Sequence, residues 1–222
     1  MQILAIEAAS PLCSAALFIQ GVTYERCRLV PQGHGQWLLP MIDGLLEEGN
    51  TTLGESSAIA FGRGPGTFTG VRMATAVAQG LAFGVDVPVL PVSTLQMLAQ
   101  GVHKDTDVDK VVVATDARMD EVYWASFDCS SGMASPISDE VLCKPGQVPS
   151  LSGAGWYGVG SGFKQYPKLS EVYSDQLIHI DGERLPRAED ALPIAVEMFE
   201  RGELVDAENA APVYLRNDVA WK

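Results

Sequence analysis

Three features of this 222-residue sequence predict an α/β fold. Short apolar runs with tight joints open the chain, which is the pattern of an antiparallel meander. The apolar period then lengthens, and helical segments alternate with further strand-like runs. A charged stretch, "HKDTDVDK", precedes a new pair of strand-like runs. We therefore expect two domains, or lobes, at residues 1–103 and residues 104–222.

The first lobe begins with three expected strands. They lie in "QILAIEAAS", in "CSAALFIQG" and in residues 22–30, and they are joined by "SPL" and by Gly21. A helix is expected at 36–48, where apolar residues recur at helical spacing and Gly49 and Asn50 follow as a stop signal. "SSAIAFG" is the next buried strand, and a glycine-rich loop leads into a helix at about 69–84. "VPVLPV" adds a strand, and Ser93 is a suitable N-cap for a helix after it.

The second half begins with its own pair of strands. Residues 111–115 form the first, "DARMD" forms a turn, and "EVYWASF" returns antiparallel to it. "CSSGMASPIS" is expected to be a loop or the tip of a hairpin, and "WYGVGSGF" a strand that runs into a glycine turn. "RAEDALPIAVEMFERGE" has the spacing of an amphipathic helix that ends at Gly202. No internal sequence repeat is evident.

Composition limits the classes of function. The chain has 28 acidic and 15 basic residues, a net charge of −13, and no basic run. Independent binding to nucleic acid is disfavoured, because neutralising phosphates requires clustered Lys and Arg. The four cysteines are scattered and form no C-x-x-C pair, so we expect buried free thiols in a reducing compartment. No signal peptide or membrane span is expected, and we predict a cytoplasmic protein.

The loop "FGRGPGTFTGVR" resembles a phosphate-binding turn between a strand and a helix. Two features argue against that function: Pro65 removes a backbone N–H donor, and no lysine or G-K-[ST] is present. We expect a structural loop that turns the strand sharply, with Thr67 or Thr69 capping the helix. Its residues are Gly62, Gly64, Pro65, Gly66, Thr67, Thr69 and Gly70.

The helix after this loop has an unusual composition. Between Gly70 and Val85 its only charged residue is Arg72, and several small residues would allow close helix approach. A helix that is apolar all round must be covered all round, so we predict a partner surface on the two first-lobe helices. An ordinary interior helix is the alternative. The predicted surface consists of Trp37, Leu38, Met41, Ile42, Leu45, Arg72, Met73, Ala76, Val77, Gly80 and Leu81.

Four stretches make the chain similar to a known family: "ILAIEAAS", "FGRGPGTFTGVRMATAVAQGLA", "DARMDEVY" and "PVYLR". It resembles the TsaB (YeaZ) family of bacterial accessory proteins for threonylcarbamoyladenosine synthesis on tRNA. The resemblance implies the actin-like, sugar-kinase-like, Hsp70-like (ASKHA) fold, with mixed central sheets and a second, smaller lobe at residues 104–222. It also implies a catalytic relative, TsaD, that transfers the threonylcarbamoyl group to adenosine beside the anticodon.

The family's chemistry can be compared with this sequence residue by residue. The catalytic relative binds a metal through two histidines that are four residues apart, but the equivalent stretch here, "VSTLQMLAQ", has none. His34, His103 and His179 have no metal-ligand spacing, so no metal site is expected. The first hairpin, "EAASPLCS", and the glycine turn "YGVGSGF" suggest a weak nucleotide site. Its candidate residues are Glu7, Ser10, Ser14, Gly158 and Gly160. In "DARMDEVY", a turn closed by an Asp–Arg pair is favoured over a catalytic cluster.

We therefore predict a non-catalytic subunit with no catalytic residues and no cofactor of its own. The resemblance implies a TsaD-like catalytic subunit and a TsaE-like P-loop ATPase as partners, and a homodimer when the chain is alone. Contact with tRNA would be indirect, and ATP or ADP with Mg²⁺ would bind only at an interface of the complex. The alternative is an independent ATPase or phosphotransferase of the same fold, which would use Glu7.

Overall fold

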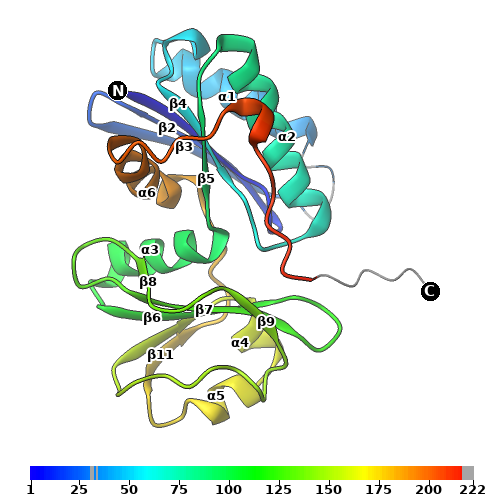
Figure 1. Ribbon diagram of the computed structural model, residues 1–222, viewed down its shortest axis with the longest axis vertical. Helices are drawn as coiled ribbons and strands as arrows, with labels where there is room; N and C mark the ends of the chain where they lie inside the picture. Colours follow the sequence, from blue (N-terminus) through cyan, green and yellow to red (C-terminus); the bar gives the residue numbers. More distant parts are fainter. Residues whose placement is uncertain (31–32, 34, 217–222) are drawn as a thin grey trace. The chain divides into compact units, whose positions relative to one another are not determined.

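The computed structural model describes residues 1–30, 33 and 35–216 (Figure 1). The chain forms two compact units, and the first is discontinuous in sequence. Unit 1 comprises Met1–Met97 and Pro186–Pro212. Unit 2 comprises Leu98–Leu185 together with residues 213–216 of the C-terminal segment. His34 lies outside the described residues.

A five-stranded mixed sheet forms the centre of unit 1, in the order β3-β2-β1-β4-β5. β1 pairs antiparallel with β2 and parallel with β4, β2 pairs antiparallel with β3, and β4 pairs parallel with β5. The strands are β1 (Gln2–Glu7), β2 (Leu12–Ile19), β3 (Val22–Leu29), β4 (Ala58–Gly62) and β5 (Val89–Val92). The first three confirm the predicted meander.

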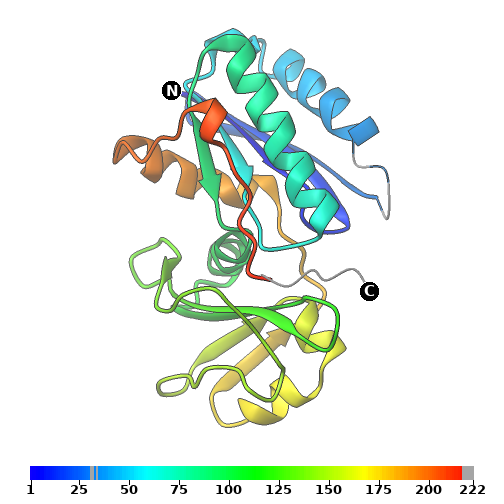
Figure 2. The ribbon, with the colours of Figure 1, turned by 45° about the vertical axis from the view of Figure 1, so that its right-hand side comes forward.

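Helices cover both faces of this sheet (Figure 2). α1 (Gly35–Glu48) and α2 (Phe68–Val85) pack on one face, and α6 (Ala188–Glu200) packs on the other. A short 3-10 turn, η1 (Leu53–Glu55), precedes β4, and another, η2 (Ala207–Asn209), lies against α2. Both faces of β1 are therefore buried, which explains its nearly continuous apolar sequence.

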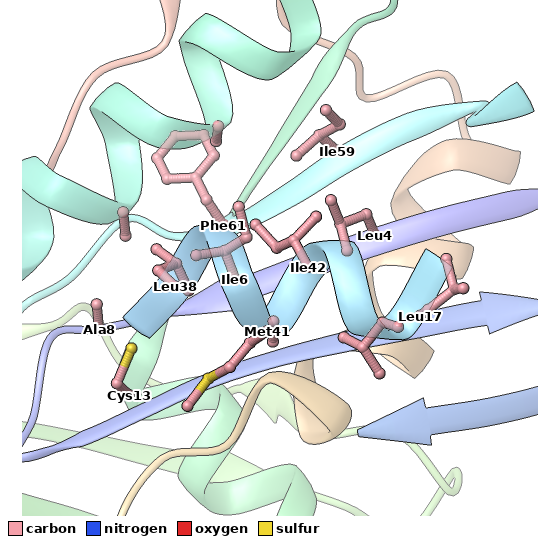
Figure 3. Packing of buried hydrophobic residues seen from close by; sticks show 14 of the residues in the cluster. Leu4, Ile6, Ala8, Cys13, Leu17, Leu38, Met41, Ile42, Ile59 and Phe61 are labelled. Atoms are coloured by element: carbon pink, nitrogen blue, oxygen red, sulfur yellow. The ribbon is translucent and has the colours of Figure 1, made fainter. Parts of the chain in front are cut away.

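The core of unit 1 lies between the sheet and the helices α1 and α2 (Figure 3). Side chains from alternate positions of β1, such as Leu4 and Ile6, meet Leu38 and Ile42 of α1. Small residues of α2 complete the cluster, because Ala74, Ala78 and Ala82 are all fully buried. These alanines allow the α2 backbone to lie close to the sheet.

Unit 2 contains a mixed sheet in the order β11-β10-β6-β7-β8, with β9 also paired to β7. Its strands are β6 (Lys110–Asp116), β7 (Val122–Asp128), β8 (Ser135–Pro136), β9 (Val141–Cys143), β10 (Trp156–Val159) and β11 (Leu177–Asp181). The short helices α4 (Ser161–Gln165) and α5 (Lys168–Val172) bury Phe163 and Leu169 in its core. α3 (Thr94–Thr106) crosses the division between the two units.

The predicted α/β fold with two mixed sheets is confirmed, but the lobe boundaries differ from those expected. Residue 103 lies inside α3, and residues 186–212 belong to unit 1 rather than to a continuous second lobe. The reason is that the apolar face of α6 packs on the first sheet. The cysteines are free as predicted, but only Cys13 and Cys129 are buried; Cys27 is exposed and Cys143 is half-buried. In the described part of the chain, no helix is long and apolar enough to span a membrane.

Candidate functional site

Glu7, the strongest nucleotide-site candidate, is fully buried at the carboxyl end of β1. Its carboxylate accepts a hydrogen bond from the backbone N–H of Ala9, and a second from the Thr94 hydroxyl at 3.0 Å. Burial raises the pKa of Glu7 to about 7, although the hydrogen bonds from Ala9, Thr94 and Ala8 oppose this shift. The carboxylate therefore joins elements of its own unit and does not face solvent.

The glycine loop packs directly on the β1–β2 hairpin, at residues 7–9. A Cβ atom at Gly62 would overlap the Glu7 carboxylate, and one at Gly70 would overlap the Ala8 carbonyl oxygen. A Cβ at Gly66 would lie 2.6 Å from the Ala9 Cβ. Glycine is needed at these positions because Gly62 touches the Glu7 carboxylate, whereas Gly66 and Gly70 touch the backbone at Ala9 and Ala8. The loop is therefore a packing element, as expected.

The loop's backbone donors are also engaged within the unit. The Arg63 N–H donates to the Val92 carbonyl at 2.9 Å, and the Thr67 N–H donates to the Ala9 carbonyl at 2.8 Å. Pro65 has no N–H to offer. Gly64 contributes its carbonyl, which accepts from the Thr94 N–H at 3.0 Å. This arrangement uses donors that a phosphate nest would need.

Thr67 is the N-cap residue of α2, as predicted, but its side chain makes no capping hydrogen bond. Both Thr67 and Thr69 are exposed. The prediction of side-chain capping is therefore wrong for Thr67. Its position is instead fixed by the backbone hydrogen bond to the hairpin at Ala9.

The other nucleotide candidates have structural positions. The Ser14 hydroxyl is buried and accepts from the Ala188 N–H at 2.9 Å, so it caps the start of α6. The Ser10 hydroxyl accepts from the Leu12 N–H at 3.1 Å within its own turn. Gly158 and Gly160 belong to unit 2, and a Cβ at Gly160 would lie 2.6 Å from the Ala114 carbonyl oxygen. Neither unit assembles these residues into one open site.

In α1, the apolar stripe expected to meet a partner faces the core of its own unit. Leu38 and Leu45 are fully buried, and Met41 and Ile42 are no more than 9% exposed. These four residues pack against β2 and its neighbours, so the prediction that they form a partner surface is wrong. Trp37 is half-buried, with the guanidinium of Arg28 3.6 Å from its ring centroid.

By contrast, α2 has an exposed apolar face. Phe83 is 78% exposed and Phe68 is 49% exposed. Between them lie the exposed residues Arg72, Ala76, Gly80 and Gly84, with Met73, Val77 and Leu81 half-buried along the border. The Arg72 guanidinium lies 3.4 Å from the Phe68 ring centroid, so even the one charged residue covers an aromatic ring. We call this set of residues the α2 face.

The cluster "DARMD" forms the predicted turn closed by an ion pair, with Arg118 Nη1 3.2 Å from Asp116 Oδ2. Within the described residues, no group of three or more His, Cys, Asp or Glu side chains is arranged to hold a metal ion. The composition of the helix predicted a partner surface on α2, but it did not point to Phe68 or Phe83.

Two mixed sheets, with helices packed on both faces of the first, define an α/β protein and are consistent with the two-lobe ASKHA fold. A family model described as TsaD, tRNA N6-adenosine threonylcarbamoyltransferase, matches residues 27–191. The Escherichia coli K12 tRNA threonylcarbamoyladenosine biosynthesis protein TsaB is 44% identical over 228 residues, covering all of this chain and 97% of the relative. The Haemophilus influenzae TsaB protein is 34% identical, covering all of this chain and 96% of the relative.

A solved structure described as YeaZ from Pseudomonas aeruginosa has a TM-score of 0.91 and 40% sequence identity. It covers 96% of this chain, which covers 99% of it. The sequence and structure comparisons agree over both units. The chain belongs to the TsaB (YeaZ) family.

Proposed function

We propose that the chain is a non-catalytic subunit of a cytoplasmic assembly that makes threonylcarbamoyladenosine on tRNA. Its relatives are tRNA threonylcarbamoyladenosine biosynthesis proteins, and the matching family model describes the transferase TsaD. In this proposal a TsaD-type subunit performs the transfer, and this chain binds and activates it. A P-loop ATPase completes the assembly, tRNA contacts the chain only through the complex, and ATP or ADP with Mg²⁺ binds at a subunit interface.

The observation that supports this proposal is the α2 face. The face is a continuous apolar strip that ends in an exposed aromatic ring on each side, and contiguous patches of this kind mark protein–protein contacts. Along this strip, a Cβ at Gly80 or at Gly84 would have no heavy atom within 4 Å. Small residues in open space allow another helix to approach closely. We infer that this face contacts either the TsaD-type subunit or, in its absence, a second copy of the chain.

An independent ATPase is the weaker candidate. Such an enzyme would use the carboxylate at the end of β1 to hold Mg²⁺, but Glu7 is 0% exposed and hydrogen-bonded within the unit. Phosphate binding at the adjacent loop would compete with the hydrogen bonds made by Arg63 and Thr67. We expect the purified chain not to turn over ATP with Mg²⁺. Turnover that Glu7→Ala abolishes would favour the enzyme instead.

The substitution Ala76→Arg tests the proposed interface. Ala76 is exposed, so the arginine should leave the fold intact while placing a long charged side chain in the centre of the α2 face. We expect at least about a hundredfold weaker binding to the TsaD-type subunit and loss of the homodimer. Ile178→Arg is the matched control, because Ile178 is 63% exposed on β11 of the other unit.

Affinity is measured by titration calorimetry, and oligomeric state by analytical ultracentrifugation. Thermal unfolding shows whether both variants remain folded. If Ala76→Arg still dimerises and still binds the catalytic subunit like the control, the interface lies elsewhere. If it binds normally but modification of tRNA stops, the chain activates its partner by another route.

A further inference from the structure

Unit 2 presents a turn of unusual backbone conformation. Arg118, Met119 and Asp120 have φ angles of 62°, 56° and 57°, so three successive residues other than glycine are left-handed. This conformation costs about 1–2 kcal/mol for each such residue. Strained segments of this kind persist only where the surrounding structure fixes them, and they concentrate at functional sites.

Asp116 fixes the turn from the strand that precedes it. Its Oδ1 accepts from the Arg118 N–H at 2.8 Å and from the Tyr166 hydroxyl at 2.9 Å. Its Oδ2 is paired with the Arg118 guanidinium. Consistent with this environment, burial and the Asp116 carboxylate raise the pKa of Tyr166 to about 12. Asp116 therefore links the turn at Arg118 to Tyr166, which follows α4.

Arg216 fixes the turn from the C-terminal segment. Its Nη1 lies 2.6 Å from the Glu121 carboxylate, and its Nη2 donates to the Ala117 carbonyl at 3.1 Å. Both contacts are within unit 2. The tip, in contrast, has little cover: the Met119 residue is 77% exposed, and the Arg118 side chain is 86% exposed. A rigid, strained turn therefore holds a flexible apolar side chain out in solvent.

Beside the turn lies a hollow of about 540 Å³. Lys144 and Lys168 line it. Gly146 leaves room for the Lys168 side chain, because a Cβ at this position would lie 2.8 Å from the Lys168 Cε. Neither Lys144 nor Lys168 has an ion pair with another described residue. The lining also contains the Asp120 carboxylate, so the two lysines leave the hollow with a net positive charge, in a chain with 28 acidic and 15 basic residues. The hollow is lined by Asp120, Lys144, Pro145, Gly146, Gln147, Gln165, Tyr166, Pro167 and Lys168.

We propose that Met119, Lys144 and Lys168 form a second docking surface, for a protein that has an apolar pocket with carboxylates at its rim. Methionine is enriched at the cores of protein interfaces and adapts to irregular pockets. The lysines would meet the carboxylates at the polar rim and speed the encounter. RNA fits less well, because Met119 offers it no charge or stacking surface and the net charge of −13 repels a polyanion.

This surface is separate in the fold from the α2 face, which belongs to unit 1. The chain would therefore bind two protein surfaces, one through each unit. This inference rests on the proposed function only for the two proteins that are tested as binding partners. These are the purified TsaD-type subunit and the purified P-loop ATPase, tested separately and together with the full chain.

The test compares Met119→Ala and the double variant Lys144→Gln/Lys168→Gln with wild type. For one component, or for the ternary complex, we expect each variant to weaken binding at least about tenfold, which is about 1.4 kcal/mol. Binding by the double variant should also depend less on salt. Ile178→Ala and Lys164→Gln are matched controls in the same unit, and Lys164 pairs instead with Glu183. They should stay within about twofold of wild type.

Equal affinity of wild type and Met119→Ala for every component and for the ternary complex would overturn the docking surface. So would a retained protein affinity combined with weaker tRNA retention in the lysine variant, because that result identifies an RNA surface. The proposed function fails separately, if Ala76→Arg leaves dimerisation and binding to the catalytic subunit unchanged.

Discussion

The glycines at the two ends of α2 have opposite surroundings. On its N-terminal side, Gly62 at the end of β4, Gly66 in the loop and Gly70 in the first turn of α2 touch residues 7–9 so closely that a Cβ at any of them would overlap or crowd them. Toward its C-terminal end, a Cβ at Gly80 or Gly84 would meet nothing within 4 Å. The first set allows contact inside the chain. In our proposal the second set allows contact with another chain.

This difference shows why a glycine-rich sequence does not by itself identify a phosphate site. The same residue type serves close backbone packing, left-handed turns, anion nests and helix approach. The neighbouring atoms decide among these functions. Here they are the Glu7 carboxylate and the Ala8 carbonyl, both of which would repel an anion.

Gly70→Ala is expected to have the largest effect. The added methyl group would overlap the Ala8 carbonyl oxygen and approach the Thr67 hydroxyl, which leaves the helix no room to stay on the hairpin. We expect the free energy of unfolding to fall by at least about 3 kcal/mol. Urea denaturation followed by circular dichroism measures it. A loss below about 1 kcal/mol would mean that the loop does not pack on the hairpin as described.

Glu7→Gln tests the burial of the Glu7 carboxyl under the glycine loop, through the pH dependence of stability. The pKa of Glu7 is raised from 4.5 to about 7, so the folded chain keeps a proton that the unfolded chain releases. This group therefore stabilises the fold most below about pH 4.5, and that stabilisation is lost as the pH rises through about 7. Relative to Glu7→Gln, wild type should lose about 3 kcal/mol of unfolding free energy between pH 4.5 and 8.

The measurement is urea denaturation of both proteins across that pH range, with the difference taken at each pH. Other carboxylates titrate in both proteins, so their contributions cancel in the difference. A difference that does not change with pH would show that Glu7 has the same pKa in the folded and the unfolded chain.

Gly80→Ala tests the exposed C-terminal half of the α2 face. Alanine favours the helix over glycine by about 0.5–1 kcal/mol, and no neighbouring atom opposes the new methyl group. The free energy of unfolding of the monomer should therefore rise by that amount. Assembly should weaken in the same variant, because the partner helix would lose its close approach. Destabilisation of the monomer would contradict the open surroundings of Gly80.

Thr67→Ala should have the smallest effect. N-cap threonines usually contribute about 1 kcal/mol through the side-chain hydrogen bond. The Thr67 side chain makes no such bond, so we expect a change below about 0.5 kcal/mol in the free energy of unfolding. Ser14→Ala is the contrasting variant, because the buried Ser14 hydroxyl does cap α6. Equal losses in the two variants would show that Thr67 caps the helix in solution.

Local patterns in the sequence predicted most of unit 1. The opening meander, α1, α2 and the Ser93 cap of α3 follow from apolar periods and turn residues, and the Ser93 hydroxyl accepts from the Gln96 N–H as expected. The orientation of α1 was not predictable in the same way. Its stripe of Leu38, Ile42 and Leu45 fits a core or an interface equally well, and only the sheet beneath it decides.

The missed features depend on long-range contacts. α6 joins unit 1 through packing on strands that lie more than 90 residues away in the sequence, so no local pattern indicates it. β11, α4 and α5 are short and have weak periodicity. The exposure of Phe68 and Phe83 could not be predicted, because a helix that is apolar on all sides does not indicate which side packs on the sheet; in the structure the opposite side of α2 fills the core.

The most direct test of the α2 face measures its accessibility before and after assembly. In a Cys27→Ser background, which removes an exposed thiol, Phe83→Cys places a thiol on the face, and Ile178→Cys serves as the control. Maleimide labelling is followed with and without saturating TsaD-type subunit. The account predicts at least about tenfold slower labelling at position 83 in the complex and no change at position 178. Unchanged labelling at position 83 within a complex that has formed would contradict it.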